Sequence, residues 1–267
     1  MKISNLKKLP KKDVIVFDLD GTLIRTKSPM DREMSGLLAD LLQSKKVAVI
    51  GGGKYDVFEE LFLRQLKCPK DLLKKLFLFP TTATAFYRYD DKWKRIYSFS
   101  LKPSDVSRIK KAFNDVFKEI GYKHPRKTYG ELIENRGGSQ VSFSVYGQDL
   151  VRVLGMRGVR MKEKWLRDNL RTKMKIARLV AKKLPDLEVR AAGFTTIDVT
   201  KKGIDKAFGI YQIEKYLKVP IKKMFFIGDA IFPGGNDYAV VKTGVDYMAV
   251  KNPEETKKII RKILQGD

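Results

Sequence analysis

Two aspartates separated by one residue directly follow a short apolar run near the start of the chain. The run covers residues 14–17, and the segment Asp18-Leu19-Asp20-Gly21-Thr22 follows it. A continuous apolar run is typical of a strand buried on both faces, whose carboxyl end is where open α/β sheets bind ligands. The alternation of a strand directs both carboxylates into one crevice. Such a pair suits a hard cation, and one carboxylate can act as nucleophile while the other transfers protons.

The scarcity of histidine and cysteine narrows the possible chemistry further. The chain has one histidine, His124, and one cysteine, Cys68. This composition excludes disulfide frameworks and the usual Cys/His zinc sites, and it argues against a Ser-His-Asp or Cys-His mechanism. Any hydrolytic chemistry must therefore use carboxylates, lysine and a hard metal.

A second group of carboxylates occurs near the end of the chain. Asp229 follows the apolar run 224–227, and Asn236 and Asp237 follow a Pro-Gly-Gly turn at 233–235. Taken alone, a Gly-Asp pair after a strand is a weak signal, because both residues are common in turns.

The elements that must position these residues alternate between strand and helix. Short buried strands are expected at 14–17, 47–50, 76–79, 224–227 and 245–250. Helices are expected between them, one starting with Ser28 as N-cap and the last capped by Asn252. This alternation predicts right-handed βαβ units around a mostly parallel sheet.

The middle of the chain has a different pattern. Runs at 85–89 and 96–100 flank a turn and predict a hairpin, and residues 140–146 alternate strictly between apolar and polar. Strict alternation indicates an antiparallel sheet with one solvated face. A long helix at 160–183 places Leu170 and Met174 on its apolar face and a basic stripe on the other.

The predicted fold class is therefore α/β, with a Rossmann-like three-layer core and an inserted α+β cap domain that has an antiparallel sheet. The catalytic core is expected to comprise residues 1–85 and 201–267, and the inserted cap residues 86–200.

Three features of the chain belong together: Phe-Asp-Leu-Asp-Gly-Thr-Leu near the start, Lys206 on a late helix, and Phe-Ile-Gly-Asp-Ala-Ile-Phe-Pro-Gly-Gly-Asn-Asp-Tyr near the end. In combination they closely resemble the motifs of the haloacid dehalogenase superfamily of phosphotransferases. An α+β insertion between the second and third motifs resembles the branch with a type-two cap. Within that branch, the Pro-Gly-Gly-Asn-Asp stretch is most similar to the eukaryotic-type phosphomannomutases.

The resemblance implies specific catalytic roles. Asp18 would attack phosphorus and form an aspartyl phosphate, and Asp20 would protonate the leaving oxygen and later activate water or a second hydroxyl. Mg²⁺ would be held by the carboxylates of Asp18 and Asp229 and the backbone carbonyl of Asp20, with support from Asp237. Lys206 would neutralise charge on the transferring group, although alone it would be taken for a solvated helix lysine.

The resemblance also implies a phosphate-binding set, which consists of Gly51, Gly52, Gly53, Lys206 and Asn236. At the second motif the superfamily usually has a Ser or Thr hydroxyl, whereas this chain continues its three glycines with Lys54. Backbone N–H groups at a helix start can still bind phosphate. Whether Lys54 adds charge to the site or is simply solvated stays open.

Phosphomannomutases hold the distal phosphate of a sugar bisphosphate with arginines, chiefly from the cap. Lys27 stands where one such arginine belongs, Arg136 matches a second, and Gln148 falls at or next to the place of a third. Arg152 or Arg157 would have to replace the remaining one. Lysine and glutamine cannot reproduce the planar fork of arginine, so hydrolysis is predicted rather than mutase activity.

Thr196 and Asp198 match the Ser-x-Asp with which the family binds sugar hydroxyls. Without the resemblance, a polar face on a half-buried strand explains them equally well. The function predicted is Mg²⁺-dependent hydrolysis of phosphate monoesters of sugars or similar small metabolites, and the alternative is a phosphosugar mutase of the phosphomannomutase type.

The formal net charge of +24 is consistent with a phosphorylated partner. Nucleic acid is the weaker hypothesis, because exposed basic helix faces are usually solvated and the same charge attracts small phosphates. Residues 1–12 lack the apolar core of a signal peptide, and no apolar run approaches the roughly 20 residues of a membrane span. The expected location is the cytoplasm, with no membrane partner.

Overall fold

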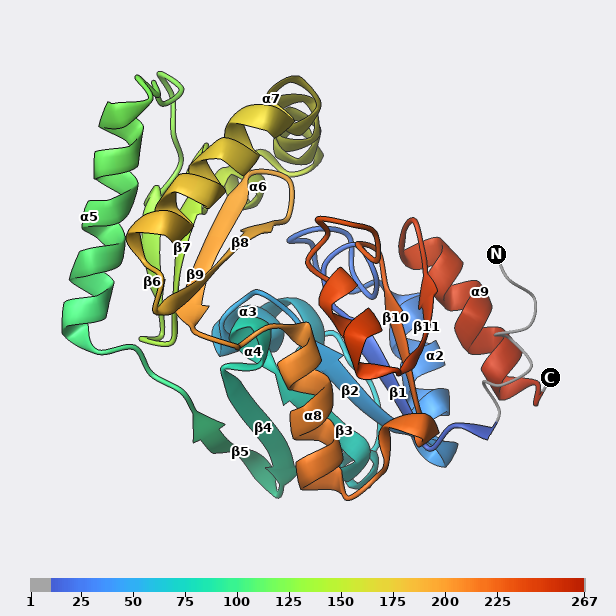
Figure 1. Cartoon of the computed structure of the whole chain (residues 1–267). Coiled ribbons are helices and arrows are strands. Elements are labelled where there is room, and N and C mark those ends of the chain that lie inside the picture. Colours follow the sequence, from blue (N-terminus) through green and yellow to red (C-terminus); the bar gives the residue numbers. More distant parts are fainter. Residues whose placement is uncertain (1–10, 267) are drawn as a thin grey trace. The chain divides into compact units, whose positions relative to one another are not determined.

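The computed structural model describes residues 11–266, so most of the basic N-terminal segment lies outside the described residues. These residues form two compact units. Unit 1 contains the described residues up to Ser98 and those from Asp205 onward, and unit 2 is Phe99–Ile204. Figure 1 labels the elements of both units.

Unit 1 is built on a seven-stranded sheet with the order β11-β10-β1-β2-β3-β4-β5. The first five strands in this order are parallel to one another, β4 pairs antiparallel with β3, and β5 pairs antiparallel with β4. The strands are β1 (Val14–Asp18), β2 (Lys46–Ile50), β3 (Leu76–Phe79), β4 (Ala85–Asp90), β5 (Lys92–Ser98), β10 (Met224–Gly228) and β11 (Asp246–Ala249). The buried strands predicted from the apolar runs are thereby confirmed, and so is the α/β fold class.

Helices cover both faces of this sheet (Figure 1). The two faces alternate along β1: Ile15 and Phe17 pack with α2 (Arg32–Ser44) and α9 (Pro253–Leu264). Val14 and Val16 pack on the opposite face with α8 (Lys206–Leu217). This alternation explains why a central parallel strand reads as an unbroken apolar run.

Two helix starts show how local capping chemistry works in unit 1. Asn252 caps α9 as predicted, with its side chain accepting a hydrogen bond from the N–H of Glu255. The prediction of Ser28 as the N-cap of the first helix was wrong. Asp31 caps α2 instead, accepting from the N–H of Met34 at 2.9 Å. Both residue types are good N-caps, so the competition was between two adequate local signals.

Short helical segments complete unit 1. They are α3 (Tyr55–Phe58), a π-helical turn (Glu59–Leu63), α4 (Pro80–Ala83), and three 3₁₀ segments (Lys70–Lys75, Ile221–Lys223 and Tyr238–Thr243).

The hairpin β4–β5 belongs to unit 1. The alternating pattern predicts that this hairpin lies in the inserted domain, but β4 pairs antiparallel with β3, with Leu78 opposite Tyr87. The apolar residues of the hairpin join the core of the large sheet, where Phe86 stacks on Phe79 with ring centroids 4.6 Å apart. The boundary between unit 1 and unit 2 therefore follows Ser98 instead of preceding Phe86.

Unit 2 is an α+β unit with a four-stranded antiparallel sheet of order β6-β7-β9-β8. Its elements are α5 (Pro103–Glu119), β6 (Ile133–Arg136), β7 (Gln140–Ser144), α6 (Leu150–Leu154), α7 (Met156–Lys183), β8 (Leu187–Ala192) and β9 (Thr196–Lys201). As the alternation predicts, Val141 and Phe143 turn one face of β7 toward the apolar residues of α5 and α7.

The other face of β7 differs from the prediction. Ser142 and Ser144 are buried instead of solvated. They are directly opposite Asp198 and Thr196 on β9, and Ser142 donates a hydrogen bond to Asp198 at 2.6 Å. Buried polar side chains are stable where they bond to one another in this way.

The buried face of helix α7 also differs from the prediction. Leu170 and Met174, expected on its buried face, are 52% and 43% exposed. The helix has a non-helical residue at Asn169, and the apolar residues that reach the core, Ile176 and Val180, lie beyond it.

Within residues 11–266, none of the helices combines the length and the apolar character that crossing a membrane would require.

Candidate active site

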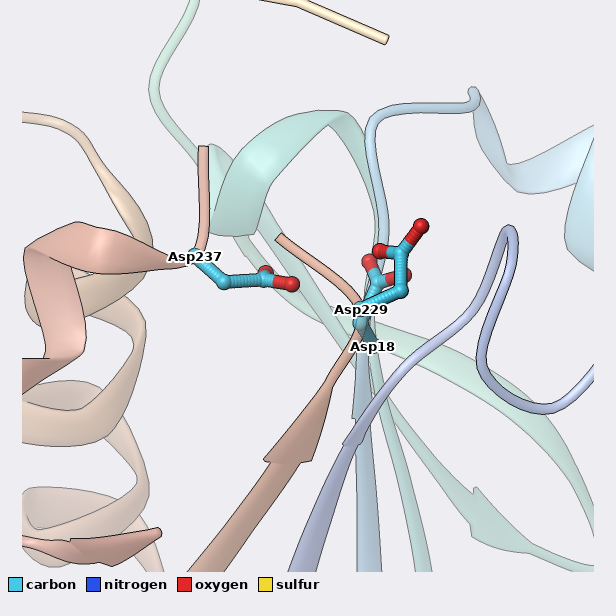
Figure 2. A group of neighbouring side chains, drawn as sticks. All are labelled: Asp18, Asp229 and Asp237. Atoms are coloured by element: carbon cyan, nitrogen blue, oxygen red, sulfur yellow. The ribbon is translucent and has the colours of Figure 1, made fainter. Parts of the chain in front are cut away.

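Three aspartates meet at the carboxyl ends of neighbouring strands in unit 1 (Figure 2). Asp18 is the last residue of β1, Asp229 directly follows β10, and Asp237 precedes the 3₁₀ segment Tyr238–Thr243. One carboxylate oxygen from each lies within 4.8 Å of the others. Because β1 and β10 are adjacent and parallel, residues 211 positions apart in the chain end at the same edge of the sheet.

Lys206 lies between two of these carboxylates. It is the first residue of α8, whose N-cap is Asp205, and its Nζ donates to Asp18 Oδ1 and to Asp237 Oδ1. The side chain is 1% exposed, so it is not the solvated lysine that its position on a helix alone would suggest. Burial lowers the pKa of Lys206, but Asp18 and Asp237 outweigh that effect and raise it above its usual range. The lysine is therefore a buried cation.

The formal charges of the three aspartates and Lys206 do not balance without a further cation. Three carboxylates and one lysine leave a formal charge of −2. Burial is the main reason that the pKa of Asp18 lies well above its usual value, with Lys206 opposing and Asp237 adding to the rise. Burial and then Asp237 raise the pKa of Asp229 to about 7. Buried carboxylates with excess negative charge take up either protons or a metal ion, and a divalent ion of the Mg²⁺ kind fits this donor set.

Two glycines make room for the carboxylates. A Cβ added to Gly21, which has φ +86°, would lie 2.3 Å from Asp229 Oδ2. One added to Gly228 would lie 2.4 Å from Asp237 Oδ2. Any other residue at either position would displace a carboxylate from the cluster.

Asp20 is held apart from the three clustered side chains. Its Oδ1 accepts a hydrogen bond from the backbone N–H of Lys27 at 2.7 Å, and among the described residues the carboxylate cluster does not include it. Lys27 has φ 52°, in the left-handed region, and its side chain is half-buried. The short segment between them thus orients Asp20 separately from Asp18, as two different roles would require.

Apart from Lys206, the predicted phosphate-binding residues lie in two loops of unit 1. Gly51, Gly52 and Gly53 follow β2, the strand next to β1. Lys54, whose role the sequence leaves open, is half-buried, and its Nζ lies 3.6 Å from Asp56 Oδ2. Asn236 is half-buried and immediately precedes Asp237. The segment α3 that follows the glycines is only four residues long before it becomes π-helical.

The predicted substrate residues of the cap form one network in unit 2. Arg136 Nη2 donates to Gln148 Oε1 at 2.7 Å, and Arg136 Nη1 lies 4.0 Å from Asp198 Oδ1. Thr196 is two residues before Asp198 on β9 and therefore shares its face of the sheet. The structure thus brings these four residues together, while Lys27 belongs to unit 1.

Two residues of this network were not predicted from the sequence. Ser142 donates to Asp198, and Glu134 accepts a hydrogen bond from Arg136 Nε at 3.0 Å. The signal in the sequence is that both residues lie in strands, on the same face as the predicted residues. The sequence alone does not show that the faces of these strands meet, because the pairing of β6, β7 and β9 is not encoded locally.

Asp229 leads to a prediction about pH. A carboxylate with a raised pKa binds more protons in the folded than in the unfolded state between its usual value of 3.8 and about 7. Its contribution to stability is therefore present at low pH and is lost as the pH rises through 7. In chelator, we expect the melting temperature of Asp229→Asn to fall less than that of the wild type between pH 5 and 8.

The control for this measurement is Asp40→Asn, which changes an exposed aspartate of α2. Adding Mg²⁺ should raise the wild-type melting temperature more at pH 8 than at pH 5, since the ion competes with the proton. Identical pH profiles for wild type and Asp229→Asn would contradict the assignment of a raised pKa to this residue.

Comparison with known proteins agrees with this architecture. Residues 34–266 match the sequence profile of the eukaryotic phosphomannomutase family. A phosphomannomutase of Encephalitozoon cuniculi is 24% identical over 257 residues, which cover 95% of this chain and 94% of that relative.

Two solved structures have a similar fold at low sequence identity. IMP-bound IMP-nucleotidase of Plasmodium falciparum aligns with a TM-score of 0.70 and 15% identity, covering 98% of this chain and 71% of the other. A haloacid dehalogenase-like hydrolase from Bacteroides thetaiotaomicron aligns with a TM-score of 0.59 and 14% identity, covering 95% and 100%.

The mostly parallel sheet, interrupted by an α+β unit, is a fold that this chain shares with the haloacid dehalogenase-like hydrolase. The match over residues 34–266 shows that the chain belongs to the eukaryotic phosphomannomutase family. It is accordingly a phosphotransferase. Asp18 and Asp20 precede the matched range, so the site geometry adds information that the profile match does not contain.

Proposed function

We propose that this enzyme hydrolyses phosphate monoesters of sugars or similar small metabolites through an aspartyl phosphate on Asp18, with Mg²⁺ as cofactor. The observation that carries the proposal is the cluster of Asp18, Asp229 and Asp237 around the buried Lys206. A carboxylate and a buried ammonium group held together at a strand end provide a nucleophile and a cation for a phosphoryl group.

In the first step, an oxygen of Asp18 attacks phosphorus and the bond from phosphorus to the leaving oxygen breaks. Asp20 gives the leaving oxygen a proton, so the alcohol departs neutral. In the second step, Asp20 takes a proton from water, whose oxygen attacks the phosphorus of the aspartyl phosphate. Inorganic phosphate leaves and the Asp18 carboxylate is restored. Lys206 orients Asp18 and stabilises negative charge on the transferring group.

The carboxylates of Asp18, Asp229 and Asp237 would hold Mg²⁺, together with the backbone carbonyl of Asp20 that the family resemblance implies. Two observations support this assignment: the formal charge of −2 among the buried side chains, and the raised pKa values of Asp18 and Asp229. When bound, the ion supplies positive charge that offsets the repulsion between these carboxylates and a phosphate dianion.

Hydrolysis is proposed over mutase activity because Arg136 already lies beside two carboxylates. Its Nε donates to Glu134, and its Nη1 lies 4.0 Å from Asp198. A mutase must hold a second phosphate of a bisphosphate, and carboxylates beside the arginine disfavour another dianion. With Gln148 and Lys27 at positions where the family has arginine, the network suits hydroxyl groups better than a phosphate.

A phosphosugar mutase is the second candidate, and the family match favours it. In that reaction the phosphoryl group on Asp18 would pass to a second sugar hydroxyl instead of water. Both candidates therefore use the same first step, and they differ only in the acceptor.

The two candidates can be separated with one substrate. Hexose 1-phosphate is incubated with Mg²⁺, with and without hexose 1,6-bisphosphate, and the products are followed by ³¹P NMR. We expect inorganic phosphate in both samples. Hexose 6-phosphate that accumulates only with the bisphosphate would establish the mutase instead.

Arg136→Ala tests whether the unit 2 network binds the substrate. We expect the KM for a phosphosugar to rise about tenfold, since one or two hydrogen bonds to the substrate are lost. The KM for p-nitrophenyl phosphate should change less than about twofold, because that ester lacks the sugar hydroxyls. Arg126→Ala, an exposed arginine of the same unit, is the control. Equal losses on both esters would show that Arg136 supports the fold instead.

A further inference from the structure

The segment that follows β3 has an unusual backbone. Thr81 (φ 48°, ψ 48°) and Thr82 (φ 58°, ψ 41°) are left-handed, and so is Ala83 with φ 65°. Glycine adopts this conformation readily, but β-branched residues rarely do. Three consecutive residues of this kind form a left-handed turn, Thr81–Ala83, that persists only if its surroundings hold it in place.

Backbone hydrogen bonds tie this turn to the glycine loop Gly51–Gly53. The N–H of Thr81 donates to the carbonyl of Gly53 at 2.8 Å, and the N–H of Thr82 donates to the carbonyl of Gly51 at 2.8 Å. A right-handed turn at the same place would point these N–H groups elsewhere. Thr81 and Thr82 are 3% and 6% exposed, so water cannot readily replace the lost bonds.

The glycine loop in turn packs against the segment that carries the nucleophile. A Cβ added to Gly51 would lie 3.1 Å from the Cβ of Leu19, the residue between Asp18 and Asp20, and 3.0 Å from Phe58 Cζ. A shift of the loop toward the site would therefore collide with this segment, and a shift away would open a gap.

The opposite side of the turn contacts the helix that carries Lys206. A Cβ added to Gly209, three residues after Lys206 in α8, would lie 3.1 Å from Ala83 Cβ and 2.7 Å from Ile50 Cδ1. Glycine at this position lets the first turn of α8 approach the left-handed turn closely.

We propose that the left-handed turn Thr81–Ala83 is a positioning element for the phosphoryl site: it sets the place of the Gly51–Gly53 loop and, through Gly209, of the α8 turn that carries Lys206. The proposal rests on the proposed function. Because this loop has glycine where the superfamily usually has a hydroxyl, its backbone is what it offers a phosphoryl group. The N–H of Gly51 already donates to the carbonyl of Phe79 at 3.2 Å, and the orientation of the peptide groups that follow Gly51 and Gly53 depends on the two carbonyls that the turn holds.

The test compares Thr82→Pro with Thr82→Gly. Proline has φ near −65° and no N–H, so it removes both the left-handed conformation and the bond to Gly51. Glycine keeps both. In Thr82→Pro we expect faster amide hydrogen exchange at residues 51–53 and a KM for phosphate esters raised about ten- to a hundredfold, whereas Thr82→Gly stays within about twofold of the wild type. Thr81→Val keeps the backbone N–H but removes the hydrogen bond between the hydroxyls of Thr81 and Thr84, so its melting temperature should fall while its KM stays close to that of the wild type.

Several results would overturn the proposal: unchanged exchange at 51–53 in folded Thr82→Pro, equal losses in the proline and glycine variants, or a large rise in KM in Thr81→Val. If Thr82→Pro does not fold, Gly209→Ala tests the same contact from α8 and should lower kcat/KM about tenfold with a small change in melting temperature. Unchanged kcat/KM in Gly209→Ala would count against the proposal. If the wild type hydrolyses no ester, the proposed function fails, while exchange at 51–53 still tests the turn.

Discussion

Replacing Asp18 with asparagine is expected to lower phosphate release to below about one thousandth of the wild-type rate, because an amide oxygen cannot form the acyl phosphate. The fold should survive. Burial and the neighbouring carboxylates raise the pKa of Asp18, so the folded protein disfavours its charged form, and a neutral isostere relieves that repulsion. Lys206 keeps Asp237 as its partner.

The same variant should also lose its response to metal. In chelator, we expect Asp18→Asn to melt at or above the wild-type temperature, and Mg²⁺ to raise that temperature much less than in the wild type. Asp20→Asn is the matched control, since its side chain is outside the cluster of three carboxylates. It should lose turnover while Mg²⁺ still stabilises it. Normal phosphate release by purified Asp18→Asn would refute the mechanism.

Lys206→Met is expected to have the largest effect on stability. It leaves Asp18 and Asp237 buried, at 4% and 0% exposure, without the cation that bonds to both. Removing one partner of a buried ion pair costs about 3–5 kcal/mol of unfolding free energy. Turnover should fall at least about a hundredfold, as with the loss of other groups that stabilise transition-state charge.

A double variant separates the two effects of Lys206. Lys206→Met combined with Asp237→Asn removes one of the two carboxylates that the loss of the lysine leaves without a cation. Urea unfolding should therefore show that part of the lost stability is restored, while turnover stays low. Mg²⁺ should likewise restore some stability to the single variant. A single variant as stable as the wild type in chelator would show that the lysine does not compensate these carboxylates.

Much of unit 1 could be predicted because its signals are local. A run such as residues 14–17 is apolar on both faces, and that pattern has few interpretations other than a buried strand. Parallel strands ending in Asp18 and Asp229 then have to meet at one edge of the sheet. The prediction of Ser28 as the N-cap was wrong because two residues capable of capping lie three positions apart, and the helix begins after the second of them, Asp31.

The arrangement of unit 2 and of the residues around the site could not be predicted without the tertiary structure. The hairpin β4–β5 alternates like an independent antiparallel sheet, yet Phe86 finds its partners in the core of unit 1. The hydrogen bond between Arg136 and Gln148 depends on where β6 and the loop after β7 meet, which neither segment encodes alone.

The sequence by itself determined the strand ends and the types of residue placed there. Only the tertiary structure decided that Lys206, an ordinary helix lysine in the sequence, is buried between two aspartates, and that Thr81–Ala83 runs left-handed. The reason is physical: local propensity favours a solvated lysine and a right-handed turn. Contacts between segments distant in the chain, including the bonds to Gly51 and Gly53, outweigh that preference.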